Sequence, residues 1–122
     1  MISTHVLDNA TGTPVAAVPI KLWVYDTTVH ANWRLVAQSV TNTDGRVKTW
    51  HTADPDADEV IQPDLINGQY RLHFDLQRYY LDKTLPVFYP YVDIVFILHD
   101  AAQHYHIPLL LSPYGYSTYR GS

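Results

Sequence analysis

The sequence predicts an all-β domain, either a β-sandwich or a barrel. Seven or eight short segments alternate apolar with polar residues or are continuously apolar, and clusters of Gly, Pro, Asn and Asp separate them. Hydrophobic residues make up 47% of the 122 residues, which is enough for one buried core. We therefore expect residues 1–122 to form a single domain, with strands at the spacing typical of sandwiches and barrels.

The first half of the chain holds four expected strands. A dense polar turn at 8–14 follows the first of them, and Asn42–Gly45 ends the third. The Asp-Gly pair in that second turn favours a tight reversal, because glycine accepts positive φ. The expected strands are Ile2–Leu7, Pro19–Tyr25, Trp33–Val40 and the shorter Val47–Thr52.

The second half begins with an acidic, proline-containing segment, Ala53–Asn67, which we expect to be a surface loop. Gln69–Leu76 alternates regularly and predicts a strand with its apolar residues inward. Asp75 is expected to cap a short helix that continues to Lys83. The next segment is apolar on both faces, as is typical of a central strand. That strand and those expected after it are Val92–Leu98, His104–Ser112 and one more in the tail.

The composition excludes several classes of function. The net charge is −4 and there is no basic run, so we expect no nucleic-acid partner. The chain has no cysteine, which excludes disulfides and thiolate catalysis. No apolar stretch approaches the ~20 residues of a membrane span, and the N-terminus has no secretory signal pattern. We therefore expect no membrane association and a cytoplasmic location.

The surface is expected to be poor in charge. Charged residues make up 16% of the chain, against roughly 25% in typical soluble proteins. Ten tyrosines partly replace them, and aromatic residues are enriched where subunits meet. This pattern favours an oligomer over a monomer with an uncharged surface.

Two histidines near the C-terminus carry the first chemical signal. His104 and His106 are two residues apart, so a strand would place both on one face. Imidazole is the side chain best suited to proton transfer near neutral pH. Together with His5, the pair could instead bind zinc through three nitrogens. A pair of solvent-exposed strand histidines is a third interpretation that the spacing leaves open.

Arg46 and the last four residues are further candidates. Arg46 follows the Asp-Gly turn and could offer a planar donor group to an anionic or carbonyl-rich ligand, or could simply face solvent. In Tyr119–Ser122, the glycine allows close approach to other backbone. Ser122 would present a carboxylate to an imidazole or guanidinium. The remaining histidines have no polar company in the sequence and are expected to be surface or structural: His30, His51, His73 and His99.

Taken together, these residues resemble the transthyretin-like family, and within it the branch that hydrolyses 5-hydroxyisourate in urate breakdown. The ending Tyr-Arg-Gly-Ser, with the His5, Arg46 and His106 set, separates that branch from the hormone-carrying transthyretins. The similar motifs span the whole chain: Ser3–Asp8 with Thr11–Pro14, Thr43–Arg46, Phe88–Pro90 and His104–Ser122.

The resemblance implies a fold and an assembly. The fold would be a transthyretin-like β-sandwich of two four-stranded sheets with one short helix. The assembly would be a homotetramer built as a dimer of dimers, with ligand sites where the dimers meet.

The resemblance also implies a reaction, in which water opens a cyclic amide of 5-hydroxyisourate to give 2-oxo-4-hydroxy-4-carboxy-5-ureidoimidazoline. No metal or organic cofactor is expected. His106 would be the general base and His5 would share its proton. Arg46 would hold substrate oxygens, and Tyr119 would position the planar ring. His104 and Ser122 would be supporting members of the site, with His104 beside the substrate and Ser122 orienting an imidazole or the water.

Other functions stay open at this point. A transthyretin-type carrier of an aromatic small molecule could use the same fold, because fold does not fix function. Against it, an apolar channel has no need of two bases and a guanidinium. A structural module within a larger assembly is a further alternative.

Overall fold

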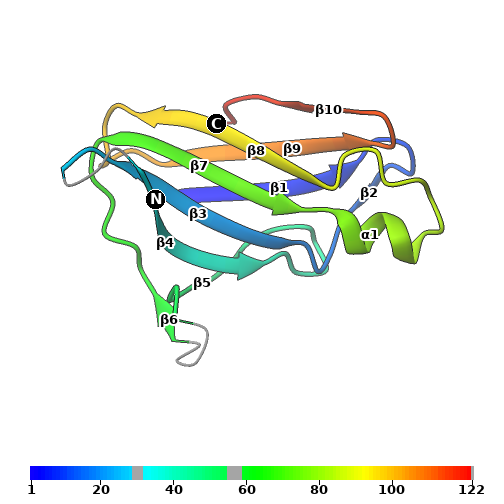
Figure 1. Ribbon diagram of the computed structural model, residues 1–122, viewed down its shortest axis with the longest axis horizontal. Coiled ribbons are helices and arrows are strands. Elements are labelled where there is room, and N and C mark those ends of the chain that lie inside the picture. The colour runs from blue at the N-terminus through cyan, green and yellow to red at the C-terminus, as the bar shows by residue number, and fades with distance from the viewer. Residues whose placement is uncertain (29–31, 55–58, 122) are drawn as a thin grey trace.

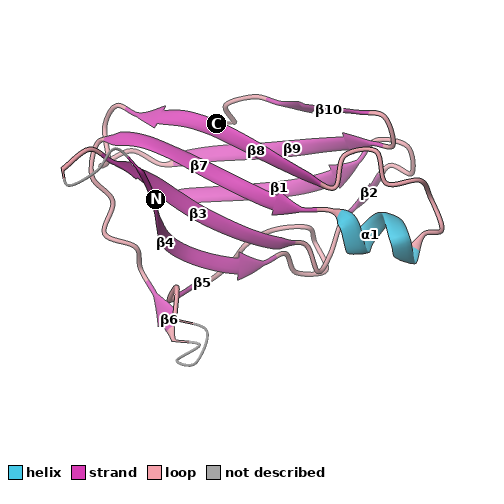
Figure 2. Cartoon of the chain, in the orientation of Figure 1, coloured by secondary structure: helices cyan, strands magenta, loops and turns pink. Residues whose placement is uncertain are grey.

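The chain folds into two β-sheets, as a computed structural model of residues 1–28, 32–54 and 59–121 describes it. Figure 1 shows the arrangement, and Figure 2 shows that strands dominate, with one short helix. One sheet has the strand order β10-β9-β1-β2 and the other the order β6-β5-β4-β3-β7-β8. Within the described residues, no helix is long and apolar enough to cross a membrane.

The strands and the helix have the following bounds. The first sheet consists of β1 (Ile2–Asp8), β2 (Thr13–Pro14), β9 (Tyr105–Ser112) and β10 (Gly115–Thr118). The second sheet consists of β3 (Pro19–Asp26), β4 (Asn32–Val40), β5 (Trp50–His51), β6 (Val60–Ile61), β7 (Gly68–Asp75) and β8 (Tyr91–Leu98). The helix α1 spans Gln77–Asp82 and follows β7.

The first sheet joins the two ends of the chain. Strand β1 pairs in parallel with β9, so the first and the penultimate strands lie side by side (Figure 1). Ser3 is opposite His106 and His5 is opposite Pro108 in this register. Strand β10 then adds to the free edge of β9 as an antiparallel neighbour. The outer face of this sheet therefore carries polar side chains from both termini.

The core lies between the two sheets. Alternate residues of β1 point inward and are buried, while the residues between them are half-buried on the outer face. Thr4 and Asp8 are the polar members of the inner row, and the Thr4 hydroxyl donates to the carbonyl of Ile107 at 2.6 Å. The buried indole of Trp50 donates to the carbonyl of Ile2 at 3.1 Å. These two bonds fix β1 against β9 and against the opposite layer.

Several strand predictions are confirmed with small changes in their bounds, and the second sheet differs in its details. It has six strands rather than four, because the two-residue strands β5 and β6 extend its edge. The expected strand Val47–Thr52 is thus reduced to Trp50–His51, and the expected loop Ala53–Asn67 contains Val60–Ile61. Pairing with a neighbour, which local sequence does not reveal, decides both cases.

The prediction of a central strand at Val92–Leu98 is wrong. Strand β8 is the outer strand of its sheet and pairs only with β7. Its inner residues are buried, whereas Val95 and Ile97 are exposed despite being apolar. The apolar outer face misled the prediction, since such a face is usual for a strand buried on both sides.

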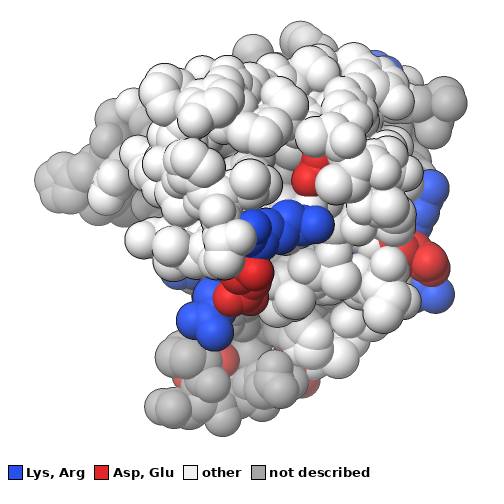
Figure 3. Space-filling view, turned by 90° about the vertical axis from the view of Figure 1, so that its right-hand side faces the viewer, with Lys and Arg blue, Asp and Glu red and all other residues white. Residues whose placement is uncertain are grey.

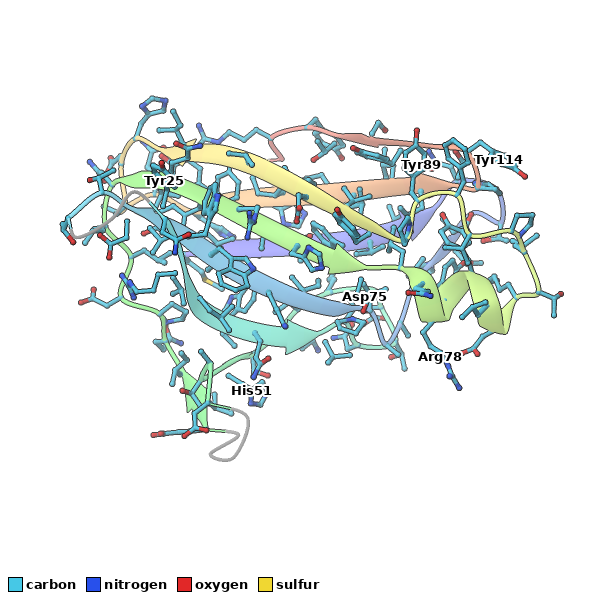
Figure 4. The ribbon with its side chains drawn as sticks, in the orientation of Figure 1. Tyr25, His51, Asp75, Arg78, Tyr89 and Tyr114 are labelled. Carbon is cyan, nitrogen blue, oxygen red and sulfur yellow. The ribbon has the colours of Figure 1, made fainter. Side chains whose placement is uncertain are left out.

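The helix forms where expected, but its cap differs. The N-cap residue is Leu76, which makes no side-chain capping bond. Asp75 accepts a hydrogen bond from the amide of Gln77, the first residue of the helix, at 3.2 Å. Figure 4 shows Asp75 at the end of β7, just before α1. Leu76, between β7 and α1, is buried.

His73, expected to be a surface or structural histidine, contacts an acidic residue of the neighbouring strand. Its Nδ1 lies 2.7 Å from an oxygen of Asp93 on β8. Beside it, the guanidinium carbon of Arg71 lies 4.5 Å from the ring centroid of Trp33 and 5.3 Å from that of Trp23. These residues form a polar and aromatic cluster on the outer face of the second sheet.

Candidate active site

The candidate site lies on the outer face of the β1–β9 pair. Ser3 and His5 come from β1, and His106 comes from β9, with His104 directly before that strand. The Ser3 hydroxyl lies 2.7 Å from Nε2 of His104 and 2.8 Å from Nδ1 of His106. The prediction that both histidines share one face of the sheet is therefore confirmed.

Arg46 is brought to this face by a tight turn packed on β1. The backbone of Arg46 bridges to that of His5, and the amide of Val6 donates to the Gly45 carbonyl at 2.8 Å. Gly45 has a φ of +74°, and a Cβ there would lie 2.4 Å from the carbonyl oxygen of Val6. Only glycine fits this position, because both the backbone angle and the close approach exclude a side chain.

Asn42 stabilises the same turn through hydrogen bonds of its side chain and its backbone. Its side-chain oxygen accepts hydrogen bonds from the amides of Asp44 and Arg46, each at 3.0 Å. Its own amide donates to the carbonyl of Arg46 at 2.8 Å. The arginine thus starts from a rigid backbone next to His5, although its side chain is exposed.

The electrostatics of the site lower the pKa of both half-buried imidazoles. Burial lowers the pKa of His5 below 6.5 and the Arg46 charge lowers it further, while a hydrogen bond to the Asp44 carbonyl opposes the shift. Burial also lowers the pKa of His106, followed by the charge of Arg46 and then those of His104 and His5. A lowered pKa favours the neutral form of both rings, the state in which imidazole can accept a proton.

The C-terminal tail packs directly against His106. The amide of Gly121 donates to the His106 carbonyl at 2.7 Å, and a Cβ at Gly121 would lie only 2.6 Å from Cδ2 of the His106 ring. One residue earlier, the guanidinium carbon of Arg120 lies 4.3 Å from the centroid of the Tyr105 ring. Its Nη2 also donates to the side chain of Gln103 at 3.1 Å. These contacts hold the tail beside the imidazole.

The start of the tail is supported by an aromatic cluster. The Phe88 ring lies 5.5 Å from that of Tyr114, and the Tyr89 ring lies 5.2 Å from that of Tyr116. Figure 4 shows Tyr89 and Tyr114 together at the turn between β9 and β10. The Phe88–Pro90 motif therefore packs against the tail, which gives this part of the sequence resemblance a physical role.

The structure brings together most of the residues that the sequence singled out. His5, Arg46 and His106 share one electrostatic cluster, and His104 joins it through Ser3. Tyr119 is 59% exposed, and the described residues around it supply no hydrogen bond or ring contact. The expectation for Ser122 lies outside the described residues.

Ser3 is the member that sequence reasoning missed. A serine in a strand gives little signal, and its partners are 101 and 103 residues away. The spacing of Ser3 and His5 was the available hint, because residues two apart in a strand share a face.

Chemically, the site combines two neutral bases with a nearby cation. Such a set can remove a proton from water and stabilise negative charge that develops on a carbonyl oxygen. Among the described residues, no three His, Asp or Glu side chains are grouped so that they could hold a metal ion.

Comparisons with known proteins identify the relatives of this chain. Residues 2–121 match the family model described as HIUase/Transthyretin family. A probable 5-hydroxyisourate hydrolase of Caenorhabditis elegans is 43% identical over 123 residues, covering 99% of this chain and 81% of the relative. The solved 5-hydroxyisourate hydrolase of Klebsiella pneumoniae has a TM-score of 0.75 at 32% identity, covering 99% and 98%. Sea bream transthyretin in complex with thyroxine has a TM-score of 0.80 at 26% identity, covering 98% and 93%.

Proposed function

The chain belongs to the HIUase/transthyretin family, and we propose that it is a 5-hydroxyisourate hydrolase acting in urate breakdown. One observation carries the proposal: two neutral imidazoles and a guanidinium from three distant segments meet on one sheet face. A carrier of an apolar ligand gains nothing from such a set. A hydrolase that must activate water and stabilise an oxyanion needs it.

The proposed reaction begins with His106, which takes a proton from water as the oxygen attacks the cyclic amide carbonyl. Arg46 stabilises the negative charge that develops on the carbonyl oxygen, and it also holds substrate oxygens. The ring carbon–nitrogen bond then breaks, and the nitrogen receives a proton from an imidazole. His5 shares the proton with His106 in this scheme, and no cofactor takes part.

The supporting roles follow the same proposal. Tyr119 would orient the planar ring of the substrate from the tail, where its exposed ring is free to meet a ligand. His104 would assist from the solvent side of Ser3. Ser122 would orient an imidazole or the water through its hydroxyl or a carboxylate.

The proposal includes a homotetramer, built as a dimer of dimers, in the cytoplasm. Strand β8 ends its sheet with Tyr91, Val95 and Ile97 exposed, and β10 ends the other. Exposed edge strands tend to pair with another chain unless they are protected. Figure 3 shows a broad, largely uncharged area over the upper part of one end of the molecule, with charges of both signs below and beside it. Such an area fits burial against another copy. Sedimentation or light scattering would measure the proposed state.

A carrier function is the second candidate. The TM-score of 0.80 with sea bream transthyretin in complex with thyroxine favours it. The two candidates differ in one measurement, the ultraviolet decay of freshly generated 5-hydroxyisourate against its spontaneous rate. A hydrolase accelerates that decay, and a carrier leaves it at the spontaneous rate.

Substitutions of single histidines test the assignment of the base in this assay. His106→Asn and His5→Asn should each lower the rate by about 10²–10⁴-fold, the usual contribution of a positioned base. His99→Asn is the matched control, because His99 is exposed and lies outside the site. Near-normal turnover in His106→Asn would contradict the assignment of the base.

A further inference from the structure

One hydroxyl group connects the two C-terminal histidines. The Ser3 oxygen lies within hydrogen-bonding distance of Nε2 of His104 and of Nδ1 of His106, at 2.7 and 2.8 Å. A serine hydroxyl has one proton to donate and can accept further hydrogen bonds. Ser3 can donate to only one of the two imidazoles, so while both rings are neutral at least one of them must donate its N–H to Ser3. The tautomers of His104 and His106 are thus coupled to each other through a single proton.

The arrangements differ in their chemistry. If Ser3 donates to Nδ1 of His106, that ring carries its proton on Nε2 and has no free nitrogen for water. If Ser3 accepts from Nδ1–H of His106, then Nε2 of His106 is unprotonated and can act as a base, since the nitrogen bonded by a neighbour sets the tautomer of the other. When Ser3 also donates to Nε2 of His104, the three groups form one hydrogen-bonded chain.

We propose that Ser3 positions His106 in its Nδ1–H tautomer and relays protons from His106 to His104. The proposal rests on the hydrolase function stated above. When Nε2 of His106 has taken the proton that the new carboxylic acid releases, its Nδ1–H bond breaks and an O–H bond forms at Ser3. The original Ser3 O–H bond breaks at the same time, and an N–H bond forms at Nε2 of His104. Only protons change place.

The reaction requires such an exit for one proton per turnover. Water supplies a hydroxyl to the carbonyl carbon and a hydrogen to the departing ring nitrogen. The new carboxylic acid then ionises, because its pKa lies far below 7, roughly 3.3–3.7 for an α-carboxyl. One proton must therefore leave the site in each cycle.

The exposure of the two rings gives the relay its direction. His106 is half-buried, and Gly121 covers one edge of its ring. His104 is exposed and can pass a proton to bulk water. On the opposite side, Arg46 repels a proton that remains on either site histidine. The path from His106 through Ser3 to His104 leads away from that positive charge and toward solvent.

The tautomer is tested by nitrogen-15 NMR of histidine-labelled protein, without substrate. The wild type and Ser3→Thr, which keeps the hydroxyl, should show His106 with its proton on Nδ1. Ser3→Ala should show a mixture of tautomers at His106. Ser117→Ala is the matched control, an exposed serine of β10 in the same sheet, and should leave the spectrum unchanged. A proton on Nε2 of His106 in the wild type, or an unchanged tautomer in Ser3→Ala, would overturn the positioning role.

The relay is tested by kinetics in dilute buffer. Ser3→Ala and His104→Gln should lose about tenfold or more in turnover, below the full ~10²–10⁴-fold of a lost base. Added free imidazole should restore part of that loss, and Ser3→Thr should keep most of the activity. Normal turnover in Ser3→Ala, or no response to imidazole, would overturn the relay. If the wild type fails to accelerate the decay, the hydrolase proposal and the relay fail together, while NMR still decides the tautomer.

Discussion

Replacing Gly121 by alanine should separate the docking of the tail from the stability of the fold. A Cβ at this position would lie 2.6 Å from Cδ2 of His106, about 1 Å short of the ~3.5–4.0 Å of an ordinary carbon–carbon contact. The neighbouring atoms offer no easy relief, because the overlap also involves Cγ at 3.2 Å and Cβ at 3.3 Å. Either the imidazole or the tail must move.

The size of the effect follows from the overpacking of the docked state, which a methyl group destabilises by about 1–3 kcal/mol. The 2.7 Å hydrogen bond from Gly121 to His106 is lost on undocking in both proteins and does not add to the difference. A loss of 1–3 kcal/mol corresponds to about 5–150-fold in the docking equilibrium. Turnover should fall by up to that factor if the docked tail completes the site. The melting temperature should change little, because the core packs elsewhere.

The assay compares three proteins. Turnover of 5-hydroxyisourate and hydrogen exchange at the amide of residue 121 are measured for the wild type, Gly121→Ala and Gly115→Ala. Gly115 is the matched control in β10, where a Cβ would meet only the Ser112 hydroxyl at an ordinary 3.4 Å. Faster exchange together with lower turnover in Gly121→Ala alone is the expected result. Unchanged turnover despite faster exchange would refute the role of the docked tail.

Two further predictions concern charge. The acid limb of the pH–rate profile should lie below pH 6.5, because the pKa values of His5 and His106 are lowered. Arg46→Ala should move this limb to higher pH, because both imidazoles are easier to protonate once the cation is lost. A limb that stays in place in Arg46→Ala would show that the guanidinium does not act on these rings. Arg71→Met should lower the free energy of unfolding by about 0.5–2 kcal/mol, the range from exposed to desolvated cation–π contacts, because Arg71 is half-buried. Turnover should stay unchanged. Chemical denaturation measures the stability, and the ultraviolet assay measures the turnover.

The local pattern of the sequence predicts most of the strands, and it fails where long-range pairing decides. The alternation in Gln69–Leu76 reflects one buried face, which the structure confirms as Tyr70, Leu72, Phe74 and Leu76. The position of β8 at the sheet edge could not be predicted in this way. An apolar outer face is compatible with burial under a second layer or with an exposed edge, and composition alone does not distinguish them.

The candidate site, too, could be predicted from local sequence only in part. The spacing of His104 and His106 predicts their common face, because the period of a strand is two. The place of Ser3 between them depends on the parallel register of β1 with β9, which pairs Ser3 with His106. No local rule fixes that register, since the two strands are separated by nearly the whole chain. The motif resemblance pointed to His5 and Arg46 without explaining why they meet.

Because of that register, the site residues come together only when β1 pairs with β9. Bringing Ser3 beside His106 closes a loop of about a hundred residues, and the entropic cost of closure grows only slowly with length. Pairing of β1 with β9 is part of forming the core, because their inner residues, among them Thr4 and Ile107, are buried in it. A partly folded chain that lacks this pair lacks the Ser3–His106 contact and the Arg46 turn, which packs on β1. The tail differs, because it holds on to a finished sheet from outside through Gly121 and Arg120. Turnover should therefore depend on two separable equilibria, global folding through the β1–β9 pair and local docking of the tail.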